Sequence, residues 1–170
     1  GTNNAFGDGD GRVTINSREG EVDIARIDAS RTQGNGADVT VDAQTRLIIG
    51  SITTDAPSGE AGAVAATTGT SGIDISSIYA RGRAGGAVTL NSADDLAIRI
   101  IDSAGGSGAA GAIRMTAQGN ILGGAATGYS GVYYSTVIRA TSTGGVGASA
   151  TLQAGGAVGI PSEYTISYGA

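Results

Sequence analysis

The chain has 170 residues with 31 glycines, 2 prolines, no cysteine and no histidine, and its 15 acidic and 10 basic residues give a net charge of -5. This composition excludes disulfides and metal sites made of Cys or His, removes the commonest general base and the thiol nucleophile, and argues against nucleic-acid binding. The length and the supply of Ile, Val and Leu favour one domain over residues 1–170, and no apolar run approaches the roughly 20 residues of a membrane-spanning helix.

The first element is the stretch GDGDGR at residues 7–12. Its alternating carboxylates resemble a calcium loop, but such a loop needs Asp at its first position and Glu at its twelfth, where this chain has Phe6 and Ser17. The alternative is a corner turn that uses the freedom of glycine at positive φ. We expect the corner, with a calcium ion on Asp8 and Asp10 as the alternative and no other cofactor.

From Gly11 onward, a glycine followed by alternating apolar residues recurs five times, with repeats starting near 11, 36, 62, 86 and 111. The first apolar residues of the copies are 26, 25, 24 and 25 residues apart, and they are Val13, Val39, Val64, Val88 and Ile113. This regular spacing is typical of a solenoid. We expect the glycines of the column to form structural corners: Gly11, Gly36, Gly62, Gly86 and Gly111.

A second phrase follows each of the first four copies and has the pattern apolar-x-apolar-x-x-apolar, as in VDIARIDA at 22–29. Alternation of apolar residues predicts a strand with one buried face. The step from Ile24 to Ile27 breaks the alternation, so we expect the chain to bend there. Each repeat then holds three short strands, around Val13–Ile15, Val22–Ile24 and Ile27–Ala29 in the first one.

Three strands and three corners in about 25 residues predict one coil of a parallel, triangular β-solenoid. The fold class is therefore all-β, a parallel β-helix in which each strand pairs with its counterpart one coil along. Propeller blades need about 40 residues, and a helix with recognisable caps is missing from every repeat.

The 25-residue spacing fails after Ile121, because the next strand candidate starts at Ala150, 37 residues after Ile113. We expect an irregular, Tyr-rich insertion near 128–149, in which VYYSTVIRA could form strands beside the tube. A last partial coil covers 150–170.

Two stretches, RTQGNGADVTVDAQTRLIIGSITTDA at 31–56 and RGRAGGAVTLNSADDLAIRIIDSAGG at 81–106, resemble the filamentous haemagglutinin-like passengers of two-partner secretion. The likeness covers about residues 7–127. It implies a right-handed β-helix, secreted across a Gram-negative outer membrane and acting at the cell surface as an adhesin, biofilm component or extracellular fibre. It carries over no catalytic residue, and the family's amino-terminal secretion domain is not recognisable.

We therefore expect a structural protein without enzymatic activity, whose open end coils adjoin further coils or stack on copies of the chain. The tyrosines near the carboxyl end could form a contact surface or a cap over the last coil. These are Tyr129, Tyr133, Tyr134, Tyr164 and Tyr168.

Two other functions are possible on the same fold. A glycan-binding module would use Tyr79, Tyr133 and Tyr134 as stacking platforms. A polysaccharide-cleaving enzyme would need paired carboxylates, for which the outward columns offer Asp23 with Asp74 and Asp28 with Asp102. An outward Thr column, Thr14, Thr40 and Thr89, is the only hint of ice binding and is interrupted by Ala65 and Arg114.

Overall fold

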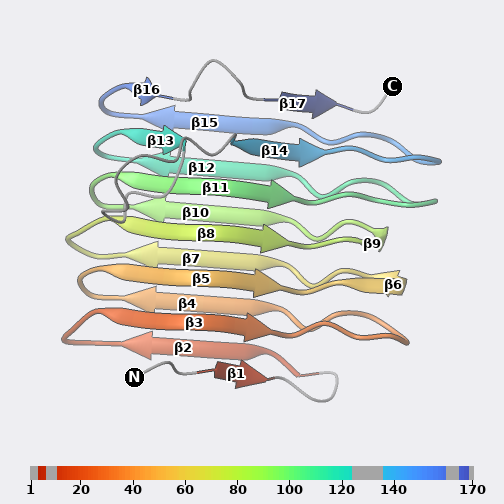
Figure 1. Ribbon diagram of the computed structural model, residues 1–170, viewed down its shortest axis with the longest axis horizontal. Helices are drawn as coiled ribbons and strands as arrows, with labels where there is room; N and C mark the ends of the chain where they lie inside the picture. The colour runs from red at the N-terminus through yellow and green to blue at the C-terminus, as the bar shows by residue number, and fades with distance from the viewer. Residues whose placement is uncertain (1–3, 7–10, 124–135, 160–164, 169–170) are drawn as a thin grey trace.

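The computed structural model describes residues 4–6, 11–123, 136–159 and 165–168. Within these ranges all helical or extended elements are β-strands, and no helix is present. All of the strand pairs are parallel. The strands stack in coils along one axis, so the molecule is a β-solenoid (Figure 1). The predicted fold class is confirmed.

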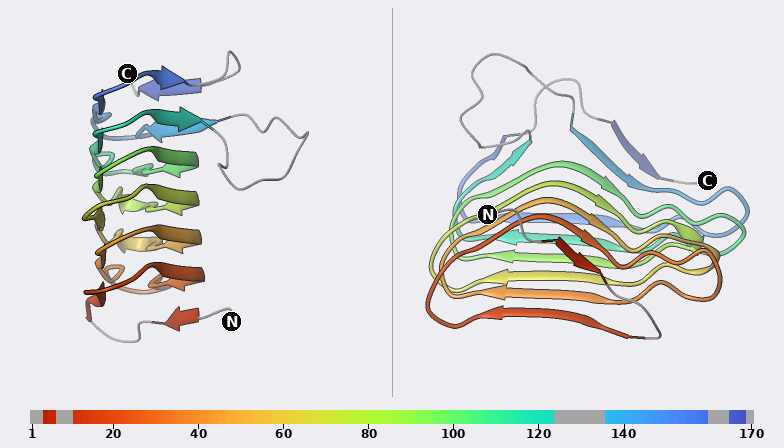
Figure 2. Two further views of the ribbon diagram at one scale, coloured as in Figure 1. Left: turned by 90° about the vertical axis from the view of Figure 1, so that its left-hand side faces the viewer. Right: turned by 60° about the horizontal axis from the view of Figure 1, so that its bottom comes forward.

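One long side of the solenoid is a sheet of straight strands, which we call the flat sheet (Figure 2). Its six strands, in spatial order, are β2 (Val13–Ser17), β4 (Val39–Ala43), β7 (Val64–Thr68), β10 (Val88–Ser92), β12 (Ile113–Ala117) and β15 (Ala150–Ala154).

The opposite side curves outward, and we call it the arched sheet (Figure 2). It consists of β1 (Asn4–Phe6), β3 (Val22–Asp28), β5 (Leu47–Thr53), β8 (Ile73–Tyr79), β11 (Leu96–Asp102), β13 (Ile121–Gly123), β14 (Val137–Ala140), β16 (Val158–Gly159) and β17 (Thr165–Tyr168). A narrow lobe connects the arched sheet back to the flat sheet at one end of each coil, and β6 (Ala56–Glu60) pairs with β9 (Gly82–Ala84) there.

The coils wind in a right-handed sense. In Figure 1 the arched-sheet strands lie nearer the viewer and run left to right, whereas the flat-sheet strands lie behind and run right to left. Since the chain climbs from the N-terminus to the C-terminus at the same time, the path is that of a right-handed helix.

The strand register reproduces the columns read from the sequence. In the flat sheet, Val39 pairs with Val13 on one side and with Val64 on the other. In the arched sheet, Ile49 pairs with Ile24 and with Ile75. The stacked apolar side chains form one core between the two sheets, and its best-covered ladder contains Ile27, Ile52, Ile78, Ile101 and Ile138, none more than 2% exposed.

The prediction of three short strands in each coil is wrong in one respect. The second and third predicted strands are a single seven-residue strand, Val22–Asp28 in the first coil. The bend lies inside that strand, at a position which the pairing skips: Ile24 pairs with Ile49 and Arg26 pairs with Ser51, with Ala25 and Gly50 between them. Hydrogen bonding on both sides of the bend keeps the strand continuous, and the lobe takes the place of the third side.

The lobe is closed at its base by a backbone hydrogen bond within each coil. Gly62 N–H donates to the carbonyl of Thr54 (3.2 Å), and Gly86 N–H donates to that of Ala80 (3.0 Å). Hydroxyl groups add to this closure: Thr54 Oγ1 donates to the Gly62 carbonyl at 2.7 Å. The two sheets are thereby held at a fixed separation where the lobe begins.

Positive φ does not explain the corner glycines. Among the described glycines only Gly34 has a positive φ, of 79°. The glycines of the column instead pack against the backbone of the neighbouring coil: a Cβ on Gly62 would lie 2.1 Å from the Ala37 carbonyl oxygen, and one on Gly86 would lie 2.2 Å from that of Gly62. Gly36 and Gly111 are equally crowded. These positions require glycine because adjacent coils approach too closely for a side chain.

The strand expected beside the tube lies within the arched sheet instead. Val137–Ala140 forms β14, which pairs with β11 so that Ile138 stacks on Ile101. The extra residues of this coil therefore precede Val137, in a part of the chain that overlaps 124–135 and lies outside the described residues. After β14 the chain enters the lobe and returns at Ala150, which pairs with Ile113.

Candidate functional site

Most of the residues predicted to act in binding lie outside the described ranges. Asp8 and Asp10 are among them, as are Tyr129, Tyr133, Tyr134 and Tyr164. Tyr168 lies on β17, where its backbone pairs with Ala140. The calcium site and the tyrosine contact surface therefore stay predictions, and the candidate sites below are built from the described residues.

A row of polar side chains follows the outer edge of the arched sheet, where its strands end and the lobe begins. We call it the edge row, and its members on successive coils are Asp28, Thr53, Tyr79, Asp102 and Arg139. Asp28 and Asp102 are the two members that the sequence places in one outward column. Arg139 was missed because the longer fifth coil shifts its position in the sequence.

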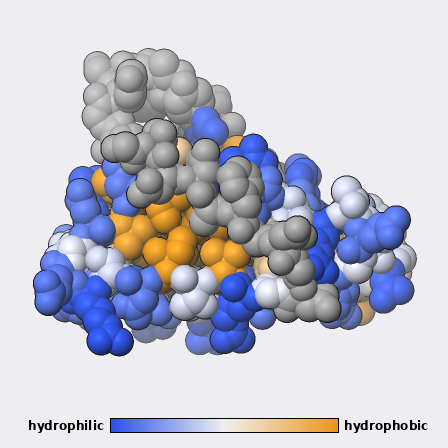
Figure 3. Space-filling view, turned by 90° about the horizontal axis from the view of Figure 1, so that it is seen from below, coloured by the Kyte–Doolittle hydropathy of each residue, from blue (hydrophilic) through white to orange (hydrophobic). Residues whose placement is uncertain are grey.

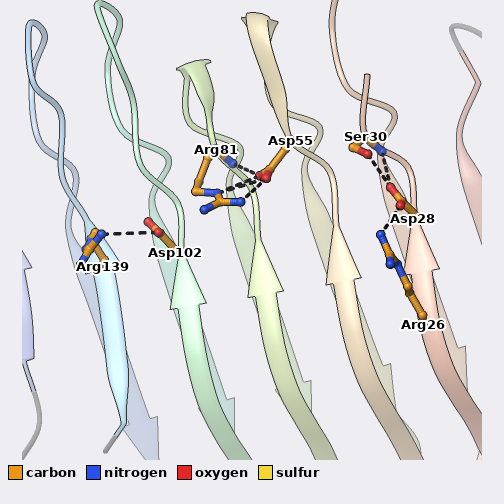
Figure 4. A network of polar contacts seen from close by, with 7 residues as sticks. All are labelled: Arg26, Asp28, Ser30, Asp55, Arg81, Asp102 and Arg139. Atoms are coloured by element: carbon orange, nitrogen blue, oxygen red, sulfur yellow. Dashed lines mark hydrogen bonds and ion pairs between the residues drawn. The ribbon is translucent and has the colours of Figure 1, made fainter. Parts of the chain in front are cut away.

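At the N-terminal end of the edge row, Asp28 forms a local cluster with Arg26 and Ser30 (Figure 4). Arg26 forms an ion pair with Asp28 Oδ2. The Ser30 hydroxyl donates to Asp28 Oδ1 at 2.5 Å, and the Ser30 N–H donates to the same atom at 3.2 Å. The hydroxyl of Ser30 and, to a smaller extent, Arg26 lower the pKa of Asp28 below its usual value, although burial opposes them. The cluster is satisfied by its own neighbours.

In the middle of the row, Arg81 joins two adjacent lobes (Figure 4). Its Nη2 lies 2.5 Å from Asp55 Oδ2, and its backbone N–H donates to Asp55 Oδ1 at 2.8 Å. This hydrogen bonding to Asp55 raises the pKa of Arg81. The guanidinium carbon also lies 4.8 Å from the centre of the Tyr79 ring. One face of Tyr79 is thus covered by Arg81, which reduces the area it can offer to a sugar ring.

The last pair of the row is Asp102 with Arg139, whose Oδ2 and Nη1 atoms are 3.6 Å apart (Figure 4). Burial raises the pKa of Asp102, and Arg139 and Arg81 oppose the rise. Neither this pair nor Asp55 with Arg81 was found from the sequence. In each pair the two residues are one coil apart in the sequence, 26 residues from Asp55 to Arg81 and 37 from Asp102 to Arg139. This spacing identifies an ion pair only when the strand register is known.

The carboxylates suggested for polysaccharide cleavage lie too far apart: Asp23 and Asp74 are two strands apart, and Asp28 and Asp102 are three strands apart. Ile48 separates Asp23 from Asp74 in the register. Two strand spacings amount to about 10 Å, which exceeds the carboxylate separations of both retaining and inverting glycosidases. Asp74 is 5% exposed and forms an ion pair with Arg46, whose Nη2 lies 3.9 Å from Oδ2. Burial raises the pKa of Asp74, and Arg46 opposes the rise.

The ends of the solenoid differ chemically from its sides. In the view from the N-terminal end, apolar side chains gather in the middle and hydrophilic ones surround them (Figure 3). Val13 and Ile15 on β2 are only partly buried, although they pack against the core. At the other end the same is true of Ala150 and Leu152 on β15. Both end strands therefore present backbone and apolar groups that no neighbouring described strand of the flat sheet covers.

Two other classes of site were sought in the described part of the chain. It contains no group of three or more His, Cys, Asp or Glu side chains placed to hold a metal ion. None of its segments is a helix of the length and hydropathy needed to cross a membrane. No protein-family model matches the sequence, and comparisons with curated proteins and with solved structures give no match.

Proposed function

We propose that this chain is a structural repeat segment of a secreted surface adhesin or extracellular fibre, and that its end coils pair with further coils. One observation carries the proposal: β2 and β15 are the outer strands of a flat parallel sheet, and each keeps the alternating pattern of the inner strands but has no outer neighbour among the described strands. A parallel sheet edge of this kind pairs readily with another strand.

The composition of the two end strands supports pairing. Natural proteins protect sheet edges with charged residues, proline or bulges. β2 reads VTINS and β15 reads ATLQA, and neither contains a charge or a proline. Of the four inner strands, β4 and β12 carry an outward charge, at Asp42 and Arg114, whereas β7 (VAATT) and β10 (VTLNS) carry none. The end strands resemble two halves of an interface more than they resemble protected edges.

The polar sides support a structural role as well. The charged groups in and beside the edge row form ion pairs: Asp28 with Arg26, Asp55 with Arg81, and Asp102 with Arg139. Surface pairs of this kind contribute about 0–1 kcal/mol each and keep the sides hydrated. Growth would therefore proceed along the axis and not sideways.

The resemblance to filamentous haemagglutinin-like passengers bears on the cellular setting. The right-handed parallel coils agree with the fold that this resemblance implies, and a surface fibre or adhesin on a Gram-negative cell is the setting that it suggests. We propose this location together with the absence of enzymatic activity.

Sedimentation velocity and negative-stain electron microscopy test the self-association. We expect particles that lengthen with protein concentration while their width stays that of one coil. Isolated particles of one size, up to concentrations of several milligrams per millilitre, would contradict self-stacking.

A further inference from the structure

The two halves of the arched sheet contain different numbers of described strands. We call each strand position along the axis a rung. The half that precedes the bend has six rungs: β3, β5, β8, β11, β13 and β16. The half that follows the bend has seven: β1, β3, β5, β8, β11, β14 and β17. The flat sheet has six.

The seventh rung arises because both chain ends add a strand to the same half. β1 pairs with Arg26–Asp28 on β3, below the first complete coil. β17 pairs with Val137–Ala140 on β14, above the last one. Two terminal strands thus extend one column at opposite ends of the solenoid, while the other two columns have no such extension among the described residues.

This excess has a consequence when one copy is placed on the next. If β2 of the upper copy pairs with β15 of the lower copy, all columns continue by one rung, and β3 of the upper copy lies directly above β16 and β17. The rung immediately below β3 is the place of β1 in its own chain. At such a junction the upper β1 and the lower β17 would occupy the same space.

The other way to join intact copies places β1 of the upper copy on β17 of the lower copy. β2 and β15 are then separated by two rung spacings, about 10 Å instead of about 4.8 Å. No backbone hydrogen bond can span that distance, and the apolar end faces stay exposed to water. Only two short strands would hold such a contact.

We propose that a second copy of this chain docks with its β2 on β15 of the first, and that the competition between β1 and β17 for one rung limits this docking. The inference rests on the self-stacking proposed above and adds its register and its control. Removing either terminal strand leaves six rungs in every column, so the junction becomes continuous. A head-to-tail contact of this kind does not close on itself and therefore builds a filament.

The register across the junction matches side chains by type. Continuing the pairing of β12 with β15, the core-facing Val13 would stack on Ala150 and Ile15 on Leu152. On the outer face, Thr14 would stack on Thr151 and Asn16 would stack on Gln153. Apolar residues meet apolar residues at the two core-facing positions, and Thr14 and Asn16 meet uncharged polar residues. Within the chain, Val13–Ser17 pairs with Val39–Ala43 in the corresponding register, where Val13, Thr14 and Ile15 also meet residues of their own kind.

Trimmed chains test the proposal. The first variant lacks residues 1–10, the second lacks 165–170 and the third lacks both segments. We expect each single deletion to lower the concentration at which filaments form by at least ten-fold relative to the full chain. The double deletion empties one rung at the junction, so we expect it to assemble less readily than either single deletion.

A full-length variant is the control for the case in which the trimmed chains misfold. Ala5→Pro removes a backbone N–H from β1, where Ala5 pairs with Ile27, and so weakens β1 without shortening the chain. Its filaments should form at a lower concentration than those of the unaltered chain. Circular dichroism and thermal unfolding should show the rest of the solenoid intact, because β1 is bonded only to β3 among the described strands.

Cysteine pairs test the register, since the chain has no cysteine of its own. In the chain lacking 1–10, the pair Thr14→Cys and Thr151→Cys should place Cα atoms about 4.8 Å apart across the junction, within the range of a disulfide. Oxidation should then give a ladder of covalent oligomers that reducing agent removes. The control pair, Thr14→Cys and Gln153→Cys, is two residues out of register and should give no ladder.

The possible outcomes separate the inference from the proposed function. Ten-fold easier assembly of the single deletions, with the in-register ladder, supports both. Equal assembly of the full and trimmed chains overturns the rung competition and leaves self-stacking in place. A ladder from the control pair alone overturns the register. If neither the full chain nor any trimmed chain assembles, self-stacking itself is wrong, and the inference fails with it.

Discussion

Two strands of nearly the same sequence show what holds this molecule together. β2 reads VTINS and lies at the end of the flat sheet, whereas β10 reads VTLNS and lies inside it. Val88 and Leu90 on β10 are fully buried, but Val13 and Ile15 on β2 are only partly buried. The sequence of a strand decides which side chains face inward, and its neighbours along the axis decide how well they are covered.

The largest effect should come from emptying the core of a middle coil. Ile75 on β8 is fully buried and stacked between Ile49 and Ile98, so Ile75→Ala leaves a cavity that costs about 2–5 kcal/mol. Ile15→Ala at the N-terminal end should cost about 1 kcal/mol, because water already reaches that side chain. Denaturant unfolding of both variants measures the difference, and equal losses would show that the end coil is covered as well as the middle.

The second effect concerns the close approach of coils. Gly86→Ala places a Cβ 2.2 Å from the Gly62 carbonyl oxygen, and the resulting shift of backbone should cost about 1–3 kcal/mol or more. Gly20→Ala in the first coil is the matched control, since its nearest atom would be 3.8 Å away, and we expect a change within about 0.5 kcal/mol. A Gly86→Ala chain as stable as the parent would show that the coils are less tightly packed at the lobe.

The third effect concerns the polar closure of the lobe. The Ser103 hydroxyl lies 2.6 Å from the Gly86 carbonyl and 2.9 Å from that of Gly111. Ser103→Ala should cost about 1 kcal/mol, a typical value for one buried hydrogen bond. The effect stays modest because Ala80 occupies the same place one coil earlier. Ser103→Thr, which imitates Thr54, should retain more stability than Ser103→Ala in thermal unfolding, and the reverse order would contradict the role of the hydroxyl.

The smallest effect separates a buried carboxylate from an exposed one in the same column. Burial raises the pKa of Asp74 in the folded chain, so folding favours its protonated form, and this contribution is lost as pH rises above the usual value of 3.8. Asp74→Asn should therefore raise the melting temperature at pH 7 by about 2–4 °C, and the gain should vanish below pH 3.8. Asp23→Asn, whose side chain is exposed in the first coil, is the matched control, and it should raise the melting temperature at pH 7 by less than Asp74→Asn does.

Much of the fold could be predicted because each coil repeats the same pattern of apolar residues and therefore makes the same contacts. The Ile and Val columns follow from alternation and from a 25-residue spacing, and the register confirms them from Val13 to Ile113. The continuity of Val22–Asp28 through its bend could not be predicted, because side-chain spacing does not reveal whether the backbone bonds continue. The crowding at Gly36, Gly62, Gly86 and Gly111 could not be predicted either, because it depends on how closely two neighbouring coils approach each other.

The candidate sites were harder to predict than the fold. Arg139 joins the edge row only after a coil of irregular length, and Arg81 reaches Asp55 through the geometry of two lobes. The competition between β1 and β17 depends on where two short terminal strands attach. Such strands lack the repeat that made the middle coils predictable.

The axial repeat of assembled filaments tests the central claim most directly. Electron cryomicroscopy of the chain lacking residues 1–10 should show one copy every six rungs, about 29 Å along the axis at about 4.8 Å per rung. A repeat of about 34 Å would mean that a seventh rung persists and that the flat sheets do not join. Filaments whose strands do not lie perpendicular to the axis, or an absence of filaments, would contradict an end-to-end structural solenoid.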